Sequence, residues 1–142
     1  MKQNQRLLSE LLKTTQLGQV EIRSVLDTSM GSLLRSALEK QLQEFDSIET
    51  EAYTIALQRG WELPELDPGV RFLKDRFTRV RLNGRNTDSR IADLLIRGNT
   101  KGMIQGLKNL HQFEGRDQPI RILSQKLLDC ETAHIRQMQS FL

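Results

Sequence analysis

The sequence predicts an all-α protein, a bundle of four long helices in a single domain covering residues 1–142. Apolar residues recur at three- and four-residue steps through four long stretches, which is the spacing of one helical face. The chain has three prolines, Pro64, Pro68 and Pro119, and none interrupts one of these stretches. Aromatic residues make up 5% of the sequence. Cores built on Leu, Ile and Ala with few aromatics are more typical of helical bundles than of β-sandwiches.

The first two helices are expected at about residues 3–26 and 32–58, joined by a short turn into an antiparallel hairpin. Several cap- and turn-forming residues lie between them, and Gly60 is a good residue to end the second helix. The predicted inward positions are Leu8, Leu11, Leu12, Thr15, Ile22 and Val25, then Leu34, Leu38, Phe45, Ile48, Ala52 and Ile55.

A second hairpin is expected over residues 87–142. Its first helix should run from an N-cap cluster at 87–89 to about Gln112, and Pro119 suits the first turn of its last helix. The predicted inward positions are Ile91, Leu94, Leu95, Met103, Leu107 and Leu110, then Ile120, Leu123, Leu127, His134 or Ile135, Met138 and Leu142.

A long crossover, residues 59–86, separates the two hairpins. Two prolines and a glycine open it, and a short amphipathic piece, RFLKDRFTRVRL, follows. A short hairpin, a long and partly helical crossover and another short hairpin are the topology of a ferritin-like bundle rather than of an up-down-up-down bundle. The alternative is another all-α fold in which the crossover packs as an independent fifth helix.

Composition indicates the compartment more than the activity. No apolar run approaches the length of a membrane span, and the N-terminus lacks a signal-peptide pattern. One cysteine, Cys130, cannot form an internal disulfide, so we expect a reduced, cytoplasmic setting. The formal net charge of +3 does not by itself indicate a nucleic-acid partner.

The stretch Glu131-Thr-Ala-His134 carries the one clear ligand motif. Di-metal bundles use a Glu from each of two helices and a Glu-x-x-His from each of the other two. The candidate metal set is Glu21, Glu44, Glu131 and His134, but Ser47 occupies the second histidine position. The alternative is an inward Glu131 satisfied by hydrogen bonds from Gln105, Asn99, Thr15 or Arg side chains. His134 also lies four residues after Cys130 and could lower its pKa, although a lone helical cysteine usually serves packing.

Three segments resemble bacterial ferritin-like four-helix families of unknown function: LGQVEIRSVL, LLIRGNTKGMIQGLKNL and KLLDCETAHIRQMQSFL. The resemblance covers nearly the whole chain and implies a bundle of bacterial origin. Members of the wider superfamily carry iron or manganese and perform oxidase, peroxidase or storage chemistry. Because residues 99–102 offer no carboxylate and Ser47 replaces a histidine, we expect no cofactor, with iron or manganese as the alternative.

Glycines repeat every four residues in the third helix, at Gly98, Gly102 and Gly106. Each costs a helix interior roughly 1 kcal/mol relative to alanine, so three on one face indicate a purpose. Three interpretations compete: close helix packing inside the bundle, including against Gly18; a homodimer interface; or room for a ligand or a long side chain.

Basic residues gather in the crossover, and the candidate anion-binding set is Arg71, Lys74, Arg76, Arg79 and Arg81. An acidic partner such as nucleic acid would explain them, but no DNA-reading motif accompanies the charge. We favour a solvated face over a crossover that packs by its phenylalanines. The sequence therefore predicts a non-catalytic protein-association module, a homodimer. Degenerate metal binding and anion binding are the alternatives.

Overall fold

The computed structural model describes residues 2–63, 87–113 and 116–142, and all regular secondary structure in these ranges is helical. The helices are α1 (Lys2–Leu26), α2 (Ser32–Arg59), α4 (Thr87–Gln112) and α5 (Gln118–Gln139). The predicted all-α class with four long helices is therefore confirmed. The amphipathic piece of the crossover lies outside the described residues. None of the described helices is long and apolar enough to cross a bilayer.

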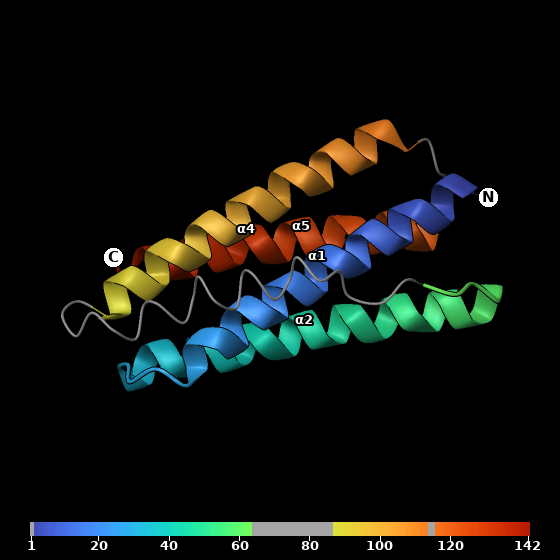
Figure 1. Cartoon of the computed structure of the whole chain (residues 1–142). Coiled ribbons are helices and arrows are strands. Elements are labelled where there is room, and N and C mark those ends of the chain that lie inside the picture. The colour runs from blue at the N-terminus through green and yellow to red at the C-terminus, as the bar shows by residue number, and fades with distance from the viewer. Residues whose placement is uncertain (1, 64–86, 114–115) are drawn as a thin grey trace.

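The four helices pack side by side as a bundle (Figure 1). α1 lies beside α2 and α4, and α5 lies beside the same two helices from the other side, with further contacts between α1 and α5. Both pairs that are adjacent in sequence, α1–α2 and α4–α5, are antiparallel, as predicted. Figure 1 also shows that α2 and α4 run in the same direction, which requires the long connection between them.

Local sequence explains the end of α2 and a contact at the start of α4. α2 ends where Gly60 adopts a left-handed conformation with φ 66°, and the Trp61 N–H then donates to the Ala56 carbonyl over 2.9 Å. Glycine takes this conformation without the steric cost of a Cβ, so its predicted role as a helix stop is confirmed. At the start of α4, the Asp88 carboxylate accepts a hydrogen bond from the Gly31 N–H (3.1 Å), which ties the α1–α2 turn to α4.

The core consists mainly of the predicted leucines and isoleucines, with Phe45 as its largest side chain. Two predicted inward positions are wrong: Leu107 is 43% exposed and Leu142 is 62% exposed. In the second half of α4 the inner face carries Gly106 and the buried Asn109, so Leu107 lies beside it. Leu142 lies beyond the end of α5 at Gln139.

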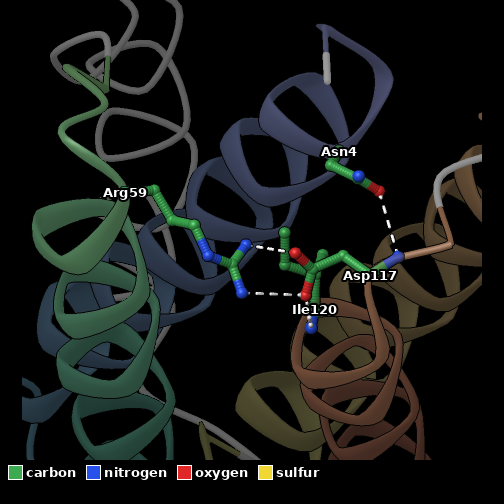
Figure 2. A network of polar contacts seen from close by, with 4 residues as sticks. All are labelled: Asn4, Arg59, Asp117 and Ile120. Carbon is green, nitrogen blue, oxygen red and sulfur yellow. Dashed lines mark hydrogen bonds and ion pairs between the residues drawn. The ribbon is translucent and has the colours of Figure 1, made fainter.

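A polar network joins three helices at one end of the bundle (Figure 2). Asp117, the N-cap of α5, accepts from the Ile120 N–H and forms a two-point ion pair with Arg59 of α2. Its own N–H donates to the side-chain oxygen of Asn4 on α1 (3.3 Å). One side chain thus caps a helix and holds α2 against α5.

Replacing Asp117 with alanine should lower the free energy of unfolding by about 1–3 kcal/mol, because it removes a cap and a partly buried ion pair together. Urea unfolding followed by circular dichroism measures the change. Asp93→Ala is the matched control, since its ion pair with Arg97 is solvent-exposed and should contribute less than about 1 kcal/mol. Equal losses in the two variants would contradict this role for Asp117.

Candidate functional site

α5 carries three chemically active side chains within one turn. Positions i, i+1 and i+4 place Cys130, Glu131 and His134 toward the bundle, because residues three and four apart share a helical face. His134 is fully buried and Glu131 is 2% exposed, whereas Cys130 is half-buried. The sequence predicted that Glu131 and His134 point inward, because both lie on the apolar stripe of this helix.

His134, Cys130 and Glu44 of α2 form a compact cluster. His134 Nε2 lies 2.9 Å from Glu44 Oε2 and 3.2 Å from Cys130 Sγ, and the thiol lies 3.5 Å from the same carboxylate oxygen. Among the described residues, this is the one group of three metal-ligating side chains whose ligand atoms all lie within 4.8 Å of one another. The side chains of a thiol, an imidazole and a carboxylate therefore converge on one point.

The imidazole of the cluster is neutral near pH 7. Burial lowers the pKa of His134, and the hydrogen bond and charge of Glu44 oppose this only in part. The neutral ring carries its hydrogen on Nε2, which donates to Glu44. Nδ1 is then an acceptor, and no described residue donates a hydrogen bond to it.

The thiol of Cys130 is protonated and unreactive as a nucleophile. Its pKa is raised to about 12, first by burial and then by the negative charges of Glu44 and Glu131, while Lys126 opposes the shift. The hypothesis that His134 lowers this pKa is therefore wrong, because a buried neutral imidazole supplies no positive charge. A metal ion could still displace the thiol proton, because its positive charge would stabilise the thiolate.

Glu131 and Glu21 form a second group, and the charge of Glu131 also acts on Cys130. Glu21 of α1 is 9% exposed, and burial raises its pKa to about 7 although Lys101 opposes the shift. Burial raises the pKa of Glu131 to about 8, and the negative charge of Glu21 contributes to the increase. The two carboxyls therefore interact, and each is costly to ionise where it stands.

The neutral side chains that were expected to satisfy Glu131 bond elsewhere. Thr15 donates to the Leu11 carbonyl, and Asn99 donates to the Leu95 carbonyl. Gln105 donates to the side chain of Asn109. Glu131 Oε1 is buried with no hydrogen-bond partner among the described residues, so the predicted satisfaction by these three groups is wrong.

The glycines of α4 leave space for these carboxyls. A Cβ on Gly98 would lie 2.4 Å from Glu21 Oε2, and one on Gly102 would lie 2.2 Å from Glu131 Oε2. At Gly106 the added atom would lie 3.0 Å from a Leu128 methyl group. The repeat thus faces the interior of the bundle, where two of its three members accommodate long acidic side chains.

Phe45 lies beside both groups. Its ring meets His134 edge-on, with centroids 4.9 Å apart, and also lines the cavity that contains Glu21 and Glu131. On α1 the ring lies over Gly18, where an added Cβ would come within 2.7 Å of it. The four predicted metal ligands therefore fall into two pairs, and Phe45 lies beside both of them.

A carboxylate-bridged di-metal centre does not fit these residues. α4 presents Gly98 and Gly102 toward the carboxyls where such a centre needs a further Glu, and Ser47 of α2 is solvent-exposed. Glu44 and His134 do come together, but with Cys130 instead of Glu131. The signal for Cys130 was its four-residue spacing from His134, which places both ligands on one face.

The predicted anion-binding residues of the crossover, Arg71, Lys74, Arg76, Arg79 and Arg81, all lie outside the described residues.

Comparison of the chain with protein-family models, with curated proteins and with solved structures finds no match.

Proposed function

We propose that this chain is a metal-binding four-helix bundle that holds a single zinc ion between Glu44, Cys130 and His134. The observation that carries the proposal is the triangle of 2.9, 3.2 and 3.5 Å between the three ligand atoms. A tetrahedral zinc ion with bonds of about 2.0–2.3 Å keeps its ligand atoms roughly 3.3–3.7 Å apart. Small outward movements of the side chains would open this triangle to that size.

The donor types favour zinc over iron or manganese. A thiolate is a soft ligand and an imidazole is intermediate, and both suit zinc, whereas manganese prefers carboxylate and water oxygens. The two hydrogens of the cluster, on Nε2 and on Sγ, both approach the Glu44 carboxylate. One divalent ion would take the place of both hydrogens and keep all three side chains together.

Three protein ligands leave a fourth tetrahedral position for water or a small anion. Solvent would reach this fourth position beside Glu44, because the Glu44 side chain is 37% exposed while His134 is fully buried. On coordination through Nε2, the His134 hydrogen would move to Nδ1, which no described acceptor contacts. Zinc-bound histidines usually donate this hydrogen to a partner, so the proposal is limited to binding of the ion.

The ferritin-like topology is part of the same proposal. Parallel α2 and α4, joined by a long connection between two antiparallel hairpins, support it. The association role and the homodimer expected from the sequence stay predictions.

Zinc titration of chelator-treated protein, in competition with a chromophoric chelator, should give one equivalent bound per chain. Cobalt substitution should produce a thiolate-to-metal charge-transfer band, because Cys130 is a ligand. At a free zinc concentration about one hundred times Kd, the folded state should gain about 2.7 kcal/mol.

Cys130→Ser should abolish the cobalt band and weaken zinc binding by at least about tenfold, and Glu44→Gln should weaken it by a similar factor. His111→Ala is the matched control, because it removes the other histidine, which is exposed and far from the cluster in the sequence. Unchanged zinc affinity in Cys130→Ser, or loss of binding in His111→Ala, would overturn the proposal.

A further inference from the structure

A cavity of about 420 Å³ opens between α1 and α4, and Phe45, which contacts His134 of the proposed zinc site, forms part of its wall. Its walls include Glu21 of α1, Glu131 of α5 and the apolar side chains of Leu17 and Phe45. A volume of this size is in the range of small-molecule sites.

The wall of the cavity includes a buried acid with one oxygen that has no hydrogen-bond partner among the described residues. Glu131 is 2% exposed and lines the cavity, and no described residue donates a hydrogen bond to its Oε1. Asn99 and Gln105 also line the cavity, but the hydrogen bond that each side-chain amide donates is made within α4. A buried carboxyl without donors is costly, so it is a group that a ligand with N–H donors would satisfy.

The shape of α4 keeps this acid in place. Any side chain larger than that of glycine at position 98 or 102 would occupy the space of a carboxylate oxygen of Glu21 or Glu131. Each of these glycines destabilises the helix by roughly 1 kcal/mol relative to alanine. If the cavity served packing alone, alanine on α4 and apolar side chains opposite would be more stable. A binding site explains why the glycines and the acids occur together.

We propose that the cavity binds a compact organic monocation, a guanidinium or amidinium group on a short apolar body. The planar, charged head would donate hydrogen bonds to Glu131 and Glu21, and the apolar body would lie against Leu17 and Phe45.

The charges on the cavity walls support a monocation. Three acids, Glu10, Glu21 and Glu131, and two lysines, Lys13 and Lys101, line the cavity. Above about pH 8, where all five groups are ionised, the walls carry one net negative charge, which a single positive head neutralises. A hard metal ion fits less well, since Ca²⁺ takes six to eight oxygen ligands. The described metal-ligand cluster lies instead around Cys130.

Calorimetric titration with benzamidine, which carries an amidinium, and with benzamide, its neutral counterpart, tests the proposal. The titrations are run at about pH 9, above the pKa values of both carboxyls. Benzamidine should bind one-to-one, and benzamide should bind at least about tenfold more weakly. Equal binding of the two probes would overturn the proposal, because the cavity would then recognise only an apolar ring.

Two variants locate the binding. Glu131→Gln keeps the shape of the side chain and should weaken benzamidine binding at least about tenfold, and its circular dichroism melt confirms that it folds. Glu39→Gln is the matched control on exposed α2 surface and should bind like wild type. Full binding by folded Glu131→Gln would overturn the proposal.

The cation site and the zinc site can fail independently. Cys130→Ser should bind benzamidine within about threefold of wild type, because its thiol does not line the cavity. If Cys130→Ser loses benzamidine binding while Glu131→Gln retains it, the probe binds at the zinc cluster and the cation site is rejected.

Discussion

Glutamine in place of Glu131 is expected to stabilise the metal-free protein above about pH 8 and to change its stability little near pH 5. The carboxyl has a pKa of about 8 in the folded chain against an ordinary value of 4.5, because burial and the negative charge of Glu21 disfavour its ionised form. The folded state therefore holds a proton that the unfolded chain releases. The free energy of unfolding falls as the pH rises from about 4.5 to about 8 and then levels off.

The expected gain in Glu131→Gln at alkaline pH is on the order of a few kcal/mol, since one pKa unit corresponds to about 1.4 kcal/mol. Glu21, with a pKa of about 7, also lowers the free energy of unfolding as the pH rises, and Lys101 reduces this effect. His134 acts in the opposite direction: its pKa is lowered, so the folded state loses stability as the pH falls below the ordinary value of 6.5. Comparing variant and wild type at each pH isolates the contribution of Glu131.

Urea unfolding of both proteins between about pH 5 and pH 9, with a metal chelator present, measures this difference. Glu39→Gln serves as the control, because its exposed side chain should give a constant difference across the range. A constant offset between Glu131→Gln and wild type would show that the carboxyl is solvated and would contradict the burial described above.

Periodicity predicted most of this fold because helical burial repeats along the chain. Leu8, Leu12 and Leu38 follow the apolar face of their helices, and all three are buried. Periodicity predicted the wrong orientation for Leu107, which is exposed, while the inward face of α4 carries Gly106. Hydrophobicity finds the side of a helix that faces the core only when that side is lined by apolar side chains.

The candidate site was only partly predictable because its pairings cross between helices. The sequence identified Glu131 and His134 as inward residues, but it could not show that they have different partners or that Phe45 lies beside both. Cys130 was assigned to packing although His134 lies four residues after it, because its second neighbour, Glu44, reaches it from α2. These contacts join α2 to α5 and depend on how all four helices pack.

The α4 glycines lead to the second large prediction, an energetic coupling between Gly102 and Glu131. In wild type, Gly102→Ala should destabilise the fold by about 1–3 kcal/mol, because the new Cβ would lie 2.2 Å from Glu131 Oε2 and the acid must move. In a Glu131→Ala background that obstacle is gone, so the same change should stabilise the fold by up to about 1 kcal/mol through helix propensity. The sign of the effect should therefore reverse.

The double-mutant cycle from urea unfolding of the four proteins should give a coupling energy of about 1–4 kcal/mol. Gly106→Ala is the matched control, since its Cβ would lie 3.0 Å from a Leu128 methyl group and does not approach the acid. Its effect should be the same with and without the Glu131 side chain. Coupling near zero at Gly102 would mean that the glycine serves the approach of the helix backbones instead. Strong coupling would show that α4 carries glycine at this position to make room for a buried acid.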